Sequence, residues 1–324
     1  MALSQGFARA IMKEASNTIE VKRMPISIFG FPALWSPYFI VVLLFITVLY
    51  FLVTIKWRKD FQQSETLTKR QALLFISAML ILYAVKGSPL DLMGHIMMTY
   101  HMVQMGVLYL VVPPMLIKAI PWWVWKPVIE LPVVKQLFSF STRPLIALIL
   151  FNGMFSFYHI PLIFDFIKMS ETLHSLYTVV LFFLAVCMWW PLVNEQPESR
   201  GLDGLKKVGY IFANGVLLTP ACALIIFASA PLYATYSDGS AWLKAMELCV
   251  PASTLSGLNL SGPELFSNMA VVEDQKTGGI VMKIIQEIVY GVVLAQVFYE
   301  WVRKEEKDAD QITEAALARH RNMQ

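Results

Sequence analysis

Seven long apolar runs constrain the fold of this chain more than any other feature. A helix of about 20 mainly apolar residues crosses the roughly 30 Å of hydrocarbon in a bilayer. The composition agrees, because hydrophobic residues make up 57%, charged residues only 15%, and the mean hydropathy is +0.58. A water-soluble fold has no means of burying so much apolar surface. We therefore predict an all-α polytopic membrane protein, a bundle of seven transmembrane helices. The runs are Ser36 to Ile55, Gln71 to Val85, Leu92 to Ile117, Pro144 to His159, His174 to Val193, Val208 to Ser229 and Gly278 to Val302.

The basic residues are distributed unevenly between the two sides of this bundle. Of the 26 Lys and Arg residues, 17 lie in the connections after the first, third and fifth runs and in the C-terminal tail. Basic residues close to the ends of spans are retained in the cytoplasm. The predicted topology therefore has the N-terminus outside and the C-terminus in the cytoplasm.

This topology divides the chain into three parts. Residues 1–35 form an outer N-terminal segment, residues 36–302 the seven-span membrane domain, and residues 303–324 a charged cytoplasmic tail. Phe7, Ile11, Ala15 and Ile19 recur every four residues, a spacing that predicts an amphipathic helix on the membrane surface or on the bundle.

Several classes of function lack support in the sequence. A net charge of +3 is too small to predict binding to nucleic acid. The chain contains no Walker loop, Rossmann fingerprint, HExxH or Gly-x-Ser-x-Gly motif, so we predict no enzyme and no catalytic residues. Cys187, Cys222 and Cys249 show no CxxC spacing and predict neither a disulfide framework nor a structural zinc site.

Histidines gather at one depth of the predicted bundle. His95, His101, His159 and His174 all fall at or within the outer half of the membrane. Polar residues embedded in a membrane are costly and usually mark a site or a pathway. The alternative is that they are hydrogen-bonded residues that pack helices together.

The third run combines histidine with methionine. On one continuous helix, His95, Met98, His101, Met102 and Met105 fall within an arc of roughly 120°, and thus on one face. Thioether is a soft ligand that favours Cu(I), and imidazole accepts copper in either oxidation state. This face therefore predicts a copper site, whereas the alternative is that the methionines are flexible core fillers.

Two acidic residues lie near the predicted site. Asp165 follows His159 closely and either orients that imidazole from behind or caps a helix N-terminus. Glu287 lies four residues after Lys283, near the outer end of the seventh run. The two form an ion pair inside the membrane, or Glu287 completes the metal shell or guards its entrance.

A series of short motifs extends over the third to seventh runs. They are His101 to Gln104, Val112 to Leu116, Ile120-Pro121, Tyr158 to Pro161, Phe164-Asp165, His174, Trp189 to Leu192, Asp274-Gln275 and Gly278-Gly279. In kind and order, these motifs resemble those of the bacterial CtaG family of caa-type cytochrome c oxidase assembly factors.

The resemblance implies a role in the maturation of a haem-copper oxidase in the bacterial cell membrane. The histidines of the family map onto His101, His159 and His174. Many members carry further histidines where this chain has Met105 and Thr178. Met105 keeps a soft ligand at its position, whereas Thr178 offers only a weak one.

Together these features predict an assembly factor that holds Cu(I) in the outer half of the membrane and passes it to the oxidase by ligand exchange. Its partners are cytochrome c oxidase subunits, an external copper donor and the lipid bilayer. Two alternatives remain open. One is a membrane cytochrome in which His101 with His159 or His174 binds haem for electron transfer. The other is a metal-free scaffold for oxidase subunits.

Overall fold

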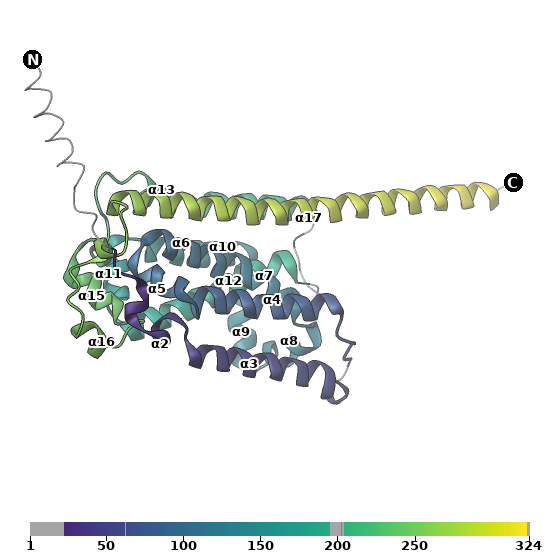
Figure 1. Cartoon of the computed structure of the whole chain (residues 1–324). Helices are drawn as coiled ribbons and strands as arrows, with labels where there is room; N and C mark the ends of the chain where they lie inside the picture. Colours follow the sequence, from purple (N-terminus) through teal and green to yellow (C-terminus); the bar gives the residue numbers. More distant parts are fainter. Residues whose placement is uncertain (1–22, 62, 195–201, 203, 323–324) are drawn as a thin grey trace, which may run out of the picture.

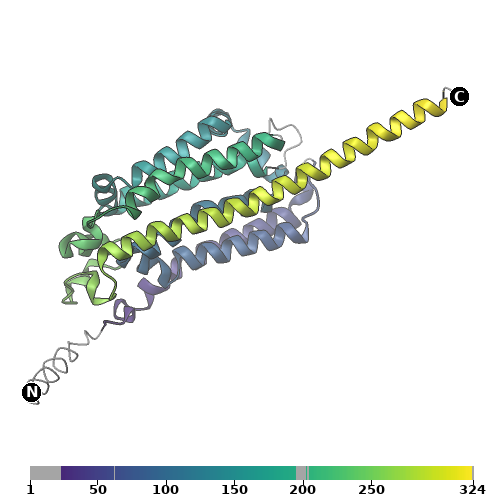
Figure 2. The same cartoon turned by 90° about the horizontal axis from the view of Figure 1, so that it is seen from above.

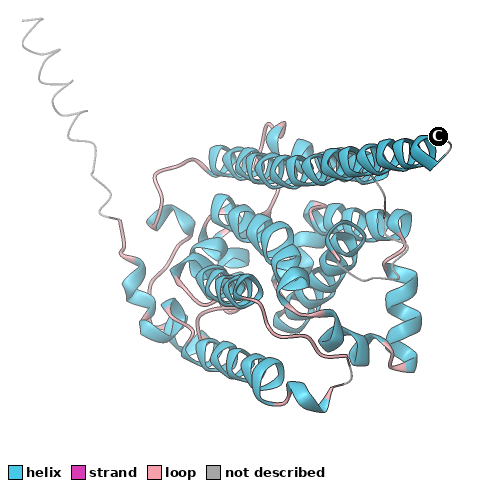
Figure 3. Ribbon diagram, turned by 90° about the vertical axis from the view of Figure 1, so that its right-hand side faces the viewer, coloured by secondary structure: helices cyan, strands magenta, loops and turns pink. Residues whose placement is uncertain are grey.

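The computed structural model describes residues 23–61, 63–194, 202 and 204–322, and every regular element in this part of the chain is a helix (Figure 3). The all-α prediction is confirmed. The amphipathic helix predicted around Phe7 and Ile19 lies outside the described residues. The elements are η1 (Ile26–Phe29), α2 (Phe31–Leu34), α3 (Pro37–Phe51), η2 (Leu52–Lys56), η3 (Arg58–Asp60), α4 (Lys69–Lys86), α5 (Pro89–Ile96), α6 (Met98–Gly106), η4 (Val107–Val111), α7 (Val112–Ala119), α8 (Trp122–Ile129), α9 (Pro132–Ser141), α10 (Pro144–Tyr158), α11 (Pro161–Lys168), α12 (Glu171–Val193), α13 (Gly204–Ile226), α14 (Ala234–Ser237), α15 (Gly239–Met246), α16 (Ala252–Ser256), η5 (Pro263–Leu265) and α17 (Val271–Asn322).

Five to seven of these helical segments are candidate membrane spans. Five of them are continuous helices. Two further candidates are pairs of helices joined at a bend, α4 with α5 at a bend of 42° and α9 with α10 at a bend of 84°. The class of a polytopic helical membrane protein is therefore confirmed, while the direction in which the spans cross stays a prediction. The five continuous candidates are Pro37–Lys56, Met98–Ala119, Glu171–Val193, Gly204–Ile226 and Val271–Gln311.

The last helix extends far beyond the bundle at one end (Figures 1 and 2). α17 contains 52 residues, which at about 1.5 Å per residue gives a length of roughly 78 Å. The predicted span Gly278 to Val302 lies inside this helix, which continues without a break into the charged tail. One helix therefore joins the membrane domain to the tail.

Short helices cover the opposite end of the bundle, which we call the capped end. It consists of α11, α14, α15 and α16 together with η5 (Figure 1). Trp242 and Met246 of α15 are fully buried and belong to one hydrophobic cluster with Leu92 and Ile96 of α5. Short helices therefore occupy much of the segment from Ala230 to Thr277.

One prediction about the spans is wrong, because the run from Leu92 to Ile117 is not a single helix. α5 ends at Ile96, Met97 has an extended backbone with φ −130° and ψ 136°, and α6 begins at Met98. Hydropathy detects only that this stretch is apolar, and the helices on both sides of the break are apolar on average. His95 therefore lies on a different helix from His101.

A carboxylate from a distant helix stabilises the new N-terminus. Asp274 of α17 accepts hydrogen bonds from the backbone N–H groups of Met98, at 2.6 Å, and Thr99, at 3.2 Å. The first N–H groups of a helix have no partner within it and carry partial positive charge. In a membrane, each N–H group left without a hydrogen-bond partner costs on the order of several kcal/mol. Asp274 removes this cost at α6.

Donors satisfy the other side of the break. Lys168 Nζ, at 3.2 Å, and the Tyr236 hydroxyl, at 2.6 Å, both donate to the carbonyl oxygen of Gly94 in α5. The last carbonyl groups of a helix have no partner within it, so these two donors supply the missing hydrogen bonds. The break is therefore held by an acceptor at one helix end and by donors at the other.

Two glycines let α17 lie close to its neighbours. A Cβ atom on Gly278 would be 3.0 Å from the carbonyl oxygen of Met98, and one on Gly279 would be 2.7 Å from Ile226 Cγ1. α17 packs against α6 and α13 at these points. The Gly278-Gly279 motif therefore permits the close approach that brings Asp274 to the break.

Candidate metal centre

The four histidines of the predicted site lie around the break at the capped end. His95 is in the last turn of α5, His101 in α6, His159 directly after α10, and His174 in the first turns of α12. They form two pairs. The ring centres of His95 and His174 are 5.8 Å apart, and those of His101 and His159 are 6.4 Å apart.

Each of these histidines has a buried ring nitrogen without a hydrogen-bond partner. A buried polar atom left unpaired costs about 1–3 kcal/mol. Other described side chains also have unpaired buried atoms, for example Trp123 Nε1 and Gln286 Oε1. An imidazole nitrogen is a good metal ligand, and a metal ion would satisfy it. The unpaired histidine atoms are His95 Nδ1, His101 Nε2, His159 Nε2 and His174 Nδ1.

The distances within the two pairs fit a shared ion. With a metal–nitrogen bond of about 2.1 Å, two imidazole rings on one ion have centres about 5.2 Å apart in tetrahedral geometry and about 6.4 Å apart in linear geometry. The observed separations of 5.8 and 6.4 Å fall within this range. The spacing of the ring centres in each pair is therefore compatible with one shared ion, and for His101 and His159 it equals the linear limit.

A backbone group fixes the orientation of His159. Its Nδ1 lies 2.7 Å from the carbonyl oxygen of Phe155, which can only accept, so Nδ1 carries the proton and Nε2 presents its lone pair. Asp165 does not have the orienting role we considered for it. Its carboxylate accepts from Ala234 N at 2.9 Å and from Thr235 N at 3.0 Å, so it caps the N-terminus of α14. The contacts of Asp165 therefore agree with the alternative of helix capping. Asp165 itself lies in α11, whereas the helix that it caps is α14.

The three methionines of the predicted face are buried in the main hydrophobic cluster. Met98, Met102 and Met105 lie on α6 with His101, but the break places His95 on α5, so the face proposed for all five residues is not that of one helix. A Cβ atom on Gly278 would be 3.2 Å from Met102 Cγ, so this side chain packs against α17.

Glu287 lies at the surface of the bundle rather than beside the histidines. Its side chain is 64% exposed and forms an ion pair with Lys283 at 2.8 Å. Lys283 also donates to Thr219 Oγ1 at 3.1 Å. The ion pair that we considered for Lys283 and Glu287 is confirmed, and a role for Glu287 in a metal shell has no support from these contacts.

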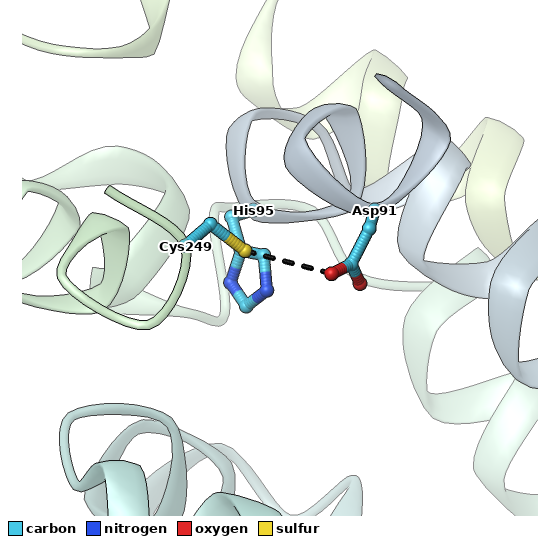
Figure 4. A group of neighbouring side chains, drawn as sticks. All are labelled: Asp91, His95 and Cys249. Atoms are coloured by element: carbon cyan, nitrogen blue, oxygen red, sulfur yellow. Dashed lines mark hydrogen bonds between the residues drawn. The ribbon is translucent and has the colours of Figure 1, made fainter. Parts of the chain in front are cut away.

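The structure adds a group that sequence reasoning missed, formed by Asp91, His95 and Cys249 (Figure 4). One ligand atom from each lies within 4.8 Å of the other two, and Cys249 Sγ is 3.7 Å from Asp91 Oδ2. Asp91 and His95 are four residues apart in α5, a spacing that puts both side chains on one helix face. This spacing could have predicted from the sequence that the two residues lie together. Cys249 comes from the capped end and has no spacing that would reveal it.

The two oxygens of Asp91 have different partners. Oδ1 accepts from Lys86 Nζ at 2.6 Å and from Gln104 Nε2 at 2.5 Å. The same Gln104 amide donates to the Val85 carbonyl at 2.6 Å, which ties α6 to the end of α4. Oδ2 faces the Cys249 sulfur. Asp91 is therefore anchored through one oxygen and offers the other to the group.

Two ionisable groups of the capped end are displaced from their ordinary protonation behaviour. Lys168 in α11 is completely buried, and burial lowers the pKa of its amine well below the usual value. Its amine also bonds to the Tyr236 hydroxyl and lies 3.8 Å from the centre of that ring. Burial, together with the nearby Asp91, raises the pKa of the Cys249 thiol well above its usual value. A metal ion must therefore displace a proton to bind this sulfur.

These observations define a class of protein: a multi-span helical membrane protein with candidate metal ligands buried at one end. The sequence model of the family described as cytochrome c oxidase caa3 assembly factor (Caa3_CtaG) matches residues 48–304. The chain belongs to this family, which is a family of assembly factors and not a known family of enzymes. No curated protein and no solved structure matches the chain.

Proposed function

We propose that this protein binds Cu(I) at the capped end and delivers it to a caa3-type cytochrome c oxidase, the enzyme that its family helps to assemble. The observation that supports this proposal is the pairing of four histidines whose buried ring nitrogens have no partner. Neutral imidazoles and the neighbouring thioethers of Met98, Met102 and Met105 are ligands suited to Cu(I). Because these ligands are neutral, they hold a monovalent ion without a charge attraction that would slow its release.

The proposal includes an arrangement in the bacterial cell membrane. Residues 36–302 form the membrane domain, the capped end and the segment 1–35 face outward, and residues 303–324 lie in the cytoplasm. The outer face would receive copper from an external donor and meet the oxidase subunits. The asymmetry of Lys and Arg supports this direction.

The surroundings of His101 favour copper over haem. Rings of Tyr158, Phe164 and Tyr236 have centres 6.0, 5.3 and 6.4 Å from that of His101. These side chains occupy the space beside the imidazole that a porphyrin bound between His101 and His159 would need. An isolated ion requires no such space, so copper suits this pair better.

The variant His101→Ala tests the proposal directly. We expect the purified variant to bind less copper per chain by elemental analysis and the cells to lose oxidase activity, while the amount of folded protein is nearly unchanged. His320→Ala is the matched control, because it removes a histidine from the tail, and it should behave as the wild type does.

Three results would contradict the proposal. Unchanged copper content and oxidase activity would remove His101 from the site. A strong Soret band in the visible spectrum of the purified wild type would indicate the cytochrome instead. Absence of copper from a wild-type protein that still supports oxidase assembly would indicate the metal-free scaffold.

A further inference from the structure

The capped end holds two ligand groups of different chemistry, one with a thiol and one without. We propose that Cu(I) occupies them in turn, first at Asp91, His95 and Cys249, with His174 beside His95, and then at His101 and His159. This inference rests on the proposed copper function and adds a path and a direction to it. We call the groups the thiol station and the imidazole station.

The break between α5 and α6 separates the stations. His95 is before the break and His101 after it. Ring contacts connect His95 with His174 and His101 with His159, and among the described residues no ring contact connects His95 with His101 or His159. Two imidazoles on one ion have centres at most about 6.4 Å apart. The two pairs are therefore not arranged to share a single ion.

Burial sets the order in which an ion reaches them. Cys249 and Asp91 are partly exposed, and the Asp91 side chain retains 15% of its surface. His95 and His101 are each 3% exposed, and His159 is completely buried. An ion that arrives at the capped end from water therefore meets Cys249 and Asp91 before any of these histidines.

The charges of the thiol station match a monovalent ion. Asp91 is paired with Lys86, so their charges cancel. When Cu(I) binds Cys249, it replaces the thiol proton, which leaves to solvent, and the thiolate balances the charge of the ion. The loaded station is then electrically neutral, whereas Zn²⁺ would leave one uncompensated positive charge. The thiol station therefore suits a monovalent ion better than a divalent one.

Transfer inward exchanges ligands and restores the proton. His174 is next to His95, with ring centres 5.8 Å apart, and so adds a further imidazole beside the thiol station. Cu(I) leaves the Cys249 sulfur for imidazole nitrogens, and the thiolate takes back a proton from solvent. No oxidant or reductant is needed, because the ion stays monovalent throughout.

Metal titrations of the full-length protein in detergent test the two stations. With Cu(I) under chelator competition, we expect two equivalents per wild-type chain, one in Cys249→Ala, and one in the double variant His101→Ala/His159→Ala. Co²⁺ supplies a separate probe, since a thiolate bound to it gives a charge-transfer band in the near ultraviolet. That band should vanish in Cys249→Ala and persist in the double variant.

The matched control removes a thiol that lies elsewhere. Cys222 is buried in α13, and Cys222→Ala should retain two equivalents and the cobalt band. Cys249→Ser keeps a polar side chain and replaces Cys249→Ala if the alanine variant folds poorly. Loading of the imidazole station should be slowed in the Cys249 variant, with its final affinity within about twofold of the wild type.

The possible results separate this inference from the function on which it rests. One equivalent in the wild type that either variant abolishes would mean a single shared site, and would overturn the two stations but not copper binding. A cobalt band that survives in Cys249→Ala would exclude the thiol. A wild-type protein that binds no copper would overturn the proposed function and this inference together.

Discussion

At the scale of residues, the backbone has roles that the sequence suggested for side chains. The carbonyl oxygen of Phe155 accepts a hydrogen bond from His159 Nδ1 and so selects the tautomer. Asp165, the carboxylate nearest in sequence, is used to cap α14. Every residue of a helix carries a carbonyl, so no sequence signal shows that this one orients an imidazole. The candidate ligands were predictable by residue type and depth, whereas their orienting partners were not.

The methionines of α6 provide a prediction at this scale. Replacement of Met98, Met102 and Met105 together by leucine keeps volume and hydrophobicity nearly constant, so the protein should fold with a loss of stability below about 1.5 kcal/mol per site. Only the soft donors disappear. We expect Cu(I) affinity to fall at least tenfold, while weak binding of Zn²⁺ by the histidines changes little, because zinc has little use for thioether.

Competition with chelators of known affinity measures both constants. Met79→Leu is the control, because this methionine is also buried but belongs to the cluster between α3 and α4. It should leave both affinities unchanged. An unaltered Cu(I) affinity in the triple variant would show that the methionines are core fillers and leave copper binding to the histidines.

At the scale of elements, the break at Met97 is the feature that arranges the site. It turns α5 away from α6, at the point where His95 and His101 would otherwise follow one another on a single face. Its stabilising partners come from remote parts of the chain, since Asp274 is 176 residues from Met98 and Lys168 is 74 residues from Gly94. A local pattern cannot reveal partners at such separations. The apolar run was therefore predicted correctly as membrane-embedded and wrongly as continuous.

Removal of the Asp274 carboxylate should weaken this arrangement. Asp274→Ala leaves the N–H groups of Met98 and Thr99 without a partner, and buried groups of this kind cost about 1–3 kcal/mol. We expect a lower unfolding temperature in detergent and reduced copper binding. Asp274→Asn should be less affected, because its amide keeps one acceptor oxygen.

The neighbouring Glu273→Ala provides the control, since Glu273 is exposed in the same turn of α17. It should unfold at the wild-type temperature to within a degree or so. Equal stability of Asp274→Ala and Glu273→Ala would mean that the carboxylate does not hold the break.

At the scale of the whole molecule, hydropathy predicted the architecture well and the assembly of ligands poorly. Each span is defined by its own residues and the thickness of a bilayer, so single runs such as Ser36 to Ile55 were located to within one residue of the helix Pro37–Lys56. The Asp91, His95 and Cys249 group depends on how the capped end folds back onto α5. Such contacts come from tertiary packing, which hydropathy does not encode.

The same architecture makes a prediction about the two ends of the bundle. If the spans cross the membrane seven times, the capped end and the projecting part of α17 lie on opposite sides, and the basic residues place the capped end outside. Ser240 in α15 and Gln311 in α17 are both exposed and report on the two ends.

In a chain whose three cysteines are replaced by alanine, a membrane-impermeant maleimide should label Ser240→Cys in cells with a permeable outer envelope and an intact plasma membrane. Gln311→Cys should react only after that membrane is opened. Labelling of both positions from one side would mean that α17 does not cross the membrane and would contradict the seven-span arrangement. Labelling of Gln311→Cys alone would reverse the direction and place the copper ligands on the cytoplasmic side.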